Sequence, residues 1–228
     1  MKKISFTLLM VAFVTMSFAQ TALKPFGAVS LHGCMRVEMV KGDTESIKIE
    51  GDAAETAEVK VNVSKEGLSV KKSWKNDVLD KHGCDCNKVR ITLTYKSVNS
   101  FKTGWGVQVN VQNPVKENEV LVEASSGSEI TLEAYAKNLE AQSSSGAIVK
   151  IAGRSESVFV KSNTDGEVLA YNLDCEDVEA KANTGGVVKV MAKNSLEASA
   201  GTGGEIKYKG QPKHRSFSRS LGGEIHGY

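Results

Sequence analysis

Thr184-Gly185-Gly186-Val187-Val188 is one of six copies of a short pattern in the second half of this chain. Each copy has a Gly-containing turn followed by a β-type run, and in five copies the turn begins with Ser or Thr. The copies recur every 18 to 20 residues, with their third residues at Ser128, Ala147, Gly166, Gly186, Gly204 and Gly223. A fixed period near 20 residues predicts a solenoid or another repeat array.

Two pairs of mostly apolar positions flank each turn, and one residue separates the members of a pair. This period of two predicts strands with one buried face. The four columns predict the core of the array: Val120, Leu139, Val158, Val178, Leu196 and Arg215; Val122, Ala141, Val160, Ala180, Ala198 and Phe217; Ile130, Val149, Val168, Val188, Ile206 and Ile225; Leu132, Ile151, Ala170, Val190, Tyr208 and Gly227.

Like residues line up from copy to copy, and stacking of successive coils explains this better than the hairpins of a sandwich do. We therefore predict an all-β fold, a right-handed parallel β-helix-like solenoid with coils of about 19 residues and a more irregular N-terminal β part. The hydroxyl residues of the turns should form a ladder along one corner. The last copy has Arg215 and Leu221 where earlier copies have aliphatic and hydroxyl residues, as expected of a capping repeat.

A family resemblance rests on these copies and on two further motifs, Ile206-Lys207-Tyr208-Lys209-Gly210-Gln211-Pro212 and the closing Gly222-Gly223-Glu224-Ile225. The chain resembles the putative auto-transporter adhesin, head GIN domain family, which occurs in secreted or envelope proteins of Gram-negative bacteria. The resemblance covers most of the chain after residue 19 and is sharpest over residues 120–228. It implies a β-helix-like fold, and it carries over no catalytic residue.

Residues 1–19 are predicted to be a signal peptide. Lys2 and Lys3 precede an apolar run that ends at Phe18, and Ser17-Phe18-Ala19 fits a cleavage site with small residues. The apolar run is shorter than the roughly 20 residues that a membrane span needs. We expect an exported chain that begins at Gln20, is located in the periplasm, at the outer-membrane surface or outside the cell, and has no transmembrane segment after removal of the signal.

The charge balance argues against a nucleic-acid partner. After residue 19 the chain has 27 Lys and Arg residues and 27 Asp and Glu residues, and no basic run. Binding to nucleic acid is driven by phosphate contacts from clustered Lys and Arg. No nucleic-acid partner is predicted.

The exported chain divides into an irregular β domain, or first coils, at residues 20–115 and regular β-solenoid repeats at residues 116–228. Short strands are predicted in the first part, but the Gly pattern is missing there. Residues 71–88 interrupt the rhythm with 18 residues that have no periodicity. Loops of this length in compact domains are usually functional or disordered.

The cysteines are expected to form disulfides, because export brings them into an oxidising compartment. Cys84 and Cys86 are separated by one residue and do not bridge each other comfortably, so one of them should pair with Cys34. This bond would tie the loop of residues 71–88 to the first strands. Cys175 is either free or half of a second bridge.

A mixed His/Cys metal site is the alternative for His32-Gly33-Cys34 and His82-Gly83-Cys84-Asp85-Cys86. The spacing does not match the usual zinc knuckle, in which two residues separate the cysteines. We therefore predict no metal and no other cofactor.

An outward column of Glu residues, at positions 129, 167, 205 and 224, raises the alternative of a carbohydrate-active β-helix enzyme. Glycosidases use two carboxyl groups about 5–10 Å apart. The column forms a ladder beside Lys150, Lys189 and Lys207 rather than a cluster in a cleft, which is typical of a solvated face. We therefore predict that the protein is not an enzyme and has no catalytic residues.

Candidate binding residues are concentrated in and near the loop of residues 71–88: Trp74, Leu79, His82 and Trp105. A loop held by a rigid scaffold often carries binding, although lone tryptophans also serve as packing anchors. We predict a non-catalytic envelope or cell-surface protein, an adhesin, binding or scaffold module. Its partner would be an envelope or host-surface protein or a glycan, and a glycan-binding protein is the alternative.

Overall fold

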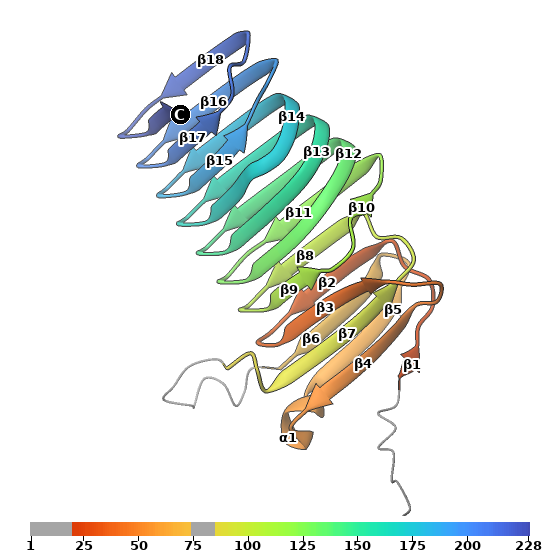
Figure 1. The fold of residues 1–228 in the computed structure, drawn as a ribbon. Helices are drawn as coiled ribbons and strands as arrows, with labels where there is room; N and C mark the ends of the chain where they lie inside the picture. The colour runs from red at the N-terminus through yellow and green to blue at the C-terminus, as the bar shows by residue number, and fades with distance from the viewer. Residues whose placement is uncertain (1–19, 74–84) are drawn as a thin grey trace, which may run out of the picture.

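The structure is a computed structural model that describes residues 20–73 and 85–228, and its strands form one long β-solenoid (Figure 1). The structure is 66% strand with almost no helix, and it has a solenoid of about seven turns, with coils of about 19 residues, and a more irregular N-terminal sheet. The predicted fold class is therefore confirmed. The single helix, α1 (Ala53–Thr56), has four residues, and no helix in the described ranges has the length and apolar character needed to span a membrane.

The regular part of the solenoid extends from residue 119 to residue 227 and contains only parallel pairs. Strands of successive coils pair with each other, and all strands of this part except β18 and β19 in the last coil pair on both sides, which is the stacking that the repeat predicted. The strands are β11 (Glu119–Ala124), β12 (Glu129–Ser144), β13 (Ile148–Asn163), β14 (Glu167–Asn183), β15 (Val187–Met191), β16 (Ser195–Gly201), β17 (Glu205–Lys209), β18 (His214–Arg219) and β19 (Glu224–Gly227).

The predicted apolar columns form the core of the coils. Val168 and its column neighbours from Ile130 to Ile206 are completely buried. In the last coil the column prediction is right for Ile225, which is 6% exposed, and wrong for Phe217, which is 37% exposed, and for Gly227, which is also exposed. Arg215 is exposed there as well. These residues lie in the terminal coil, so only one side of the coil is covered by a neighbour.

The Gly turns are held by a backbone ladder at one corner. Thr184 has φ 50° and Gly185 has φ 72°, and two successive residues with positive φ define the type I′ turn that joins β-strands tightly. The N–H of Gly185 donates to the carbonyl of Thr202 in the next coil, 3.2 Å away. The turn residues predicted to form a ladder do stack at this corner, and their backbone carbonyls accept the hydrogen bonds that join one turn to the turn of the previous coil.

The N-terminal part contains three more coils, and their order in space differs from their order in the chain. β2 (Ala28–His32) and β3 (Arg36–Lys41) form one coil, which lies between two others in parallel pairing. On one side are β6 (Gly67–Lys72) and β7 (Val89–Tyr95), and on the other are β8 (Ser100–Gly104) and β9 (Gln108–Val111). β8 and β9 pair onward with β11 and β12, so parallel pairing continues into the regular part.

Antiparallel strands close the N-terminal end of the stack. β4 (Ser46–Gly51) pairs with β7, β5 (Val59–Ser64) pairs with β6, and β1 (Thr21–Ala22) pairs with β4. The short β10 (Val115–Lys116) joins the stack at β12. The two ends of the stack therefore differ. The coil of β6 and β7 at one end is covered by β4 and β5. At the other end, β18 and β19 each pair on one side only within the described chain (Figure 1).

Candidate functional site

The structure brings together those predicted site residues that it describes. Trp74, Leu79, His82 and Cys84 lie outside the described residues. The Sγ atoms of Cys34 and Cys86 are 2.7 Å apart, and the Cys86 thiol is 3.1 Å from the carbonyl oxygen of Gly106. Trp105 precedes this glycine, so the two cysteines and the tryptophan lie at the same corner of the solenoid.

Trp105 occupies a turn position that is filled by Ser or Thr in the following five coils. Its φ is 59° and its side chain is 53% exposed, and the N–H of Gly106 donates to the carbonyl of Ser126 at 3.0 Å, as in the other turns. Trp105-Gly106-Val107 is therefore another copy of the turn pattern, which the sequence analysis missed. A bulky residue at positive φ is an outlier that merits a functional explanation.

His32 lies beside this corner, next to Gly104. It is half-buried, and its Nδ1 is 3.3 Å from the Ser30 hydroxyl. Desolvation by burial and the nearby charge of Lys71 lower the pKa of His32 below its ordinary value. Among residues 20–73 and 85–228, His32, Cys34 and Cys86 do not make a set of three closely spaced ligands.

Cys175, which the sequence left as free or bridged, is a free thiol inside the core. It is 1% exposed and donates a hydrogen bond of 3.2 Å to the carbonyl of Leu173. Burial, followed by the negative charge of Asp174, raises its pKa to about 12. A thiol of this kind is structural, because reactivity requires the thiolate.

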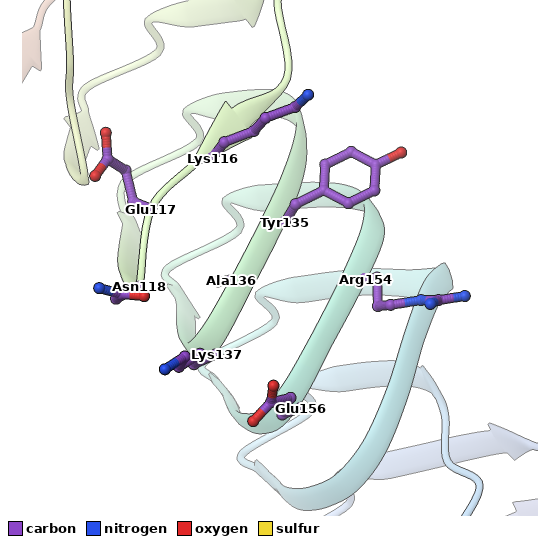
Figure 2. Close-up of a pocket in the computed structure, with 8 residues that line it drawn as sticks. All are labelled: Lys116, Glu117, Asn118, Tyr135, Ala136, Lys137, Arg154 and Glu156. Carbon is purple, nitrogen blue, oxygen red and sulfur yellow. The ribbon is translucent and has the colours of Figure 1, made fainter.

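A hollow of about 430 Å³ opens at the opposite bend of the coils, between the β10–β11 connection and the bends of β12 and β13 (Figure 2). Tyr135 projects into solvent from β12 beside Lys116, and Arg154 projects from the next coil (Figure 2). The Tyr135 side chain is 43% exposed, although it lies in a solenoid whose large apolar residues are mostly inside. The lining residues are Lys116, Glu117, Asn118, Tyr135, Ala136, Lys137, Arg154 and Glu156.

Three side chains of the Tyr135 hollow, those of Tyr135, Lys116 and Arg154, have defined neighbours. The Tyr135 hydroxyl donates to Glu133 Oε1 at 2.6 Å, and this hydrogen bond raises the pKa of the phenol. Lys116 Nζ is 5.9 Å from the Tyr135 ring centroid, within cation–π range. Arg154 contacts Asp174 at 3.2 Å. The hollow therefore offers an aromatic face with charged donors and acceptors around it.

One glycine allows the bend beneath this hollow. Gly153, next to Arg154, has φ 116°, and a Cβ atom there would lie 2.1 Å from the carbonyl oxygen of Ala134 in the previous coil. No side chain fits at that distance, so glycine is required for the coils to stack closely at this point. The spacing of Arg154 from Tyr135 thus depends on a local feature that the repeat pattern did not reveal.

A longer, shallow groove crosses the coils on the face that contains β8, β11 and β16. Its two parts, of about 550 and 370 Å³, share Ser157 and Phe159. Phe159 lies between the outward carboxylates of Glu140 and Glu179, and Lys181 Nζ is 5.3 Å from its ring centroid. The groove follows the solenoid axis and suits an extended partner.

Two members of the Glu column do come close together. Ligand atoms of Glu205, Glu224 and His226 lie within 4.8 Å of one another, the single such group in the described ranges that could hold a metal ion. Glu205 contacts Lys207 at 2.6 Å and Glu224 contacts His226 at 2.9 Å. Glu224 is exposed, so this group lies on an open surface of the last two coils.

The fold defines a class, the parallel β-solenoids with one coil per repeat. The family model described as "Putative auto-transporter adhesin, head GIN domain" matches residues 25–212, and the chain belongs to this family. The resemblance inferred from the repeats is therefore confirmed.

Solved structures show the same fold at low sequence identity. A putative adhesin from Bacteroides fragilis NCTC 9343 is 21% identical with a TM-score of 0.80, and one from Parabacteroides distasonis ATCC 8503 is 15% identical with a TM-score of 0.71. A putative lipid binding protein from Parabacteroides distasonis ATCC 8503 is 17% identical with a TM-score of 0.62. Each match covers 92% of this chain and 95% of the other. No curated protein matches the chain.

Proposed function

We propose that this protein is a non-catalytic binding module of the bacterial cell envelope or surface, and that it recognises a glycan at the Tyr135 hollow. Membership of an adhesin family indicates a protein of the envelope or surface. The solenoid supplies a rigid frame, because every coil is hydrogen-bonded to its neighbours along its strands. Binding to a preformed site avoids much of the entropic cost of ordering side chains.

The observation that carries the proposal is the exposed ring of Tyr135 with charged groups around it. Aromatic rings provide a flat apolar surface with a polar edge, which suits the C–H faces of a sugar ring. Sugar hydroxyl groups act as both donors and acceptors, and the hollow presents donors on Lys116 and Arg154 and acceptors on Glu117. Small-ligand sites commonly combine an apolar wall with a few fixed polar groups.

A glycan array probed with residues 20–228 tests the proposal. Wild type and Tyr135→Phe should bind the same glycans, whereas Tyr135→Ser should bind them about tenfold more weakly, because aromatic packing contributes about 1 kcal/mol. Tyr228→Ser is the matched control, since Tyr228 is also exposed and lies on the last coil. The glycans should be recovered intact, which a hydrolysis assay on the same panel measures.

Two further variants distinguish the Tyr135 hollow from the two other candidate binding sites, the loop corner and the long groove. Trp105→Ser tests the loop site with Trp74, Leu79 and His82, and Phe159→Ser tests the long groove. Unchanged glycan binding in both variants supports the Tyr135 hollow. If Trp105→Ser abolishes binding and Tyr135→Ser does not, recognition belongs to the loop corner. Binding to no glycan on the array would contradict the proposal.

A further inference from the structure

The coils carry an uneven distribution of charge along the solenoid axis. Residues 116–212 contain ten Lys and Arg residues and fifteen Asp and Glu residues, whereas residues 213–228 contain three Lys and Arg residues and one Glu. Lys207 is paired with Glu205. Lys213, Arg215 and Arg219 are exposed, and no carboxylate within the described ranges forms an ion pair with them. The last coil is therefore a basic end on an acidic body.

The same coil also gathers exposed apolar side chains. Five large hydrophobic residues are exposed in the described chain, and three of them lie in the last coil: Phe217 at 37%, Leu221 at 80% and Tyr228 at 72%. Leu221 has φ 48° and occupies the turn position that holds Ser or Thr in the five preceding coils. A strained backbone that presents an aliphatic side chain to solvent is costly unless that side chain has a partner.

We propose that the last coil, residues 213–228, docks end-on to a membrane surface that contains anionic phospholipid. Basic side chains are attracted to the negative potential of such a surface, while aromatic and Leu side chains enter the headgroup region. The acidic coils behind it are repelled by the same potential. The solenoid would therefore stand on this end, with the Tyr135 hollow held away from the lipid.

A second copy of the chain fits this end less well. Two last coils placed face to face would bring the Arg215 and Arg219 side chains of both copies together, and like charges at an interface are unfavourable. Arg219 Nη2 also donates to the carbonyl of Ile225 at 3.0 Å, across the end of the coil. Charged side chains on an edge strand protect the sheet edge from pairing with another strand.

Vesicle co-sedimentation tests the docking surface with residues 20–228. The protein should bind vesicles of phosphatidylcholine with one-third phosphatidylglycerol, bind pure phosphatidylcholine much more weakly, and lose binding as salt is raised. Lys213→Ser combined with Arg215→Ser should weaken binding about 25-fold, at about fivefold for each cation. The matched control, Lys161→Ser combined with Lys189→Ser, removes two cations from the acidic coils and should leave binding unchanged.

Leu221→Ser keeps the test valid if the charge variants fold poorly. It introduces the residue that Ser126 and Ser145 provide at the same turn position, so stability should not fall, while vesicle binding should weaken about tenfold through lost apolar burial. Equal binding of wild type and Leu221→Ser, or equal losses in the Lys161/Lys189 control, would overturn the proposal. Saturable binding of inorganic phosphate alone, or a dimer that Leu221→Ser dissociates, would instead assign this end to a free anion or to a second copy.

Discussion

At the residue scale, the thiol of Cys175 links ionisation to folding. Burial raises its pKa from 9.0 to about 12, so the folded protein holds the proton more tightly than the unfolded chain does. The contribution of the protonated Cys175 thiol to the free energy of unfolding is fully present below pH 9, and it is lost as pH rises from 9 to 12. At its full extent it amounts to about 4 kcal/mol.

This linkage is measured by urea unfolding of wild type and Cys175→Ala at pH 7 and pH 10.5. The stability difference between the two proteins should shrink by about 2 kcal/mol at the higher pH, because the ionised thiol is tolerated only in the unfolded wild type. A thiol reagent at pH 8 should label Cys175 only after unfolding. A constant stability difference, or rapid labelling of the folded protein, would contradict the burial of this group.

A second prediction at this scale concerns the redox state of the cysteines, because Cys34 and Cys86 are in contact. Peptide mass spectrometry of the oxidised protein should show Cys34 linked to Cys84 or Cys86, since an exported chain would reach an oxidising compartment in which disulfides form. Reduction should lower the free energy of unfolding by about 2–4 kcal/mol, while Cys34→Ser should be insensitive to reductant. Four free thiols or stoichiometric zinc in the purified protein would reject this pairing.

At the scale of the element, the Gly turns carry strain that a single substitution should relieve. Thr184 has φ 50°, a region that β-branched residues rarely adopt and that Asn adopts more easily. Asn-Gly is the preferred pair for a type I′ turn. Thr184→Asn should therefore raise the free energy of unfolding by about 1 kcal/mol.

Thr131→Asn is the matched control for this turn variant. Thr131 is exposed on β12, where strand geometry favours Thr over Asn, so this substitution should lower stability slightly. The measurement is the midpoint of urea unfolding for both variants. A lower midpoint for Thr184→Asn would mean that the Thr184 side chain makes a contact worth more than the strain.

The elements show what the sequence could and could not predict. The columns that include Val149 and Val168 predicted buried strand faces correctly, because alternation of apolar and polar residues reports directly on burial. The Trp105-Gly106 turn was missed because a Trp replaces the hydroxyl residue that defined the pattern. The Tyr135 hollow was missed for a different reason: its residues come from three strands at bend positions, where no apolar repeat is required.

At the scale of the whole molecule, the order of the coils in space could not be predicted from the sequence. The coil of β6 and β7 lies outside the coil of β2 and β3, although it follows it in the chain. Strand patterns identify which face is buried, but several coils with similar apolar faces stack equally well in either order. The antiparallel cover of β4 and β5 follows from this arrangement, since it closes the edge that the displaced coil would otherwise expose.

In a solenoid of this kind, the loss of stability caused by a buried charge should depend on the position of the substituted residue along the axis. Each coil contacts only its neighbours, so stability is approximately a sum over coils and interfaces. Val168 lies in a central coil and is completely buried, whereas Ile225 lies in the last coil and is 6% exposed. An unpaired buried charge costs several kcal/mol at the first site, while the second site can avoid the cost by local opening of one coil.

Val168→Asp should therefore lower the melting temperature sharply and reduce amide protection throughout the central coils. Ile225→Asp should leave the melting temperature nearly unchanged and raise hydrogen exchange only in β18 and β19, because opening the last coil breaks a single interface. Val187→Asp is the control, since Val187 lies in an outward column and is only half-buried, so its charge would have access to water. A tolerated Val168→Asp with an unchanged melting curve would contradict the register of the coils, and global unfolding caused by Ile225→Asp would contradict their near independence.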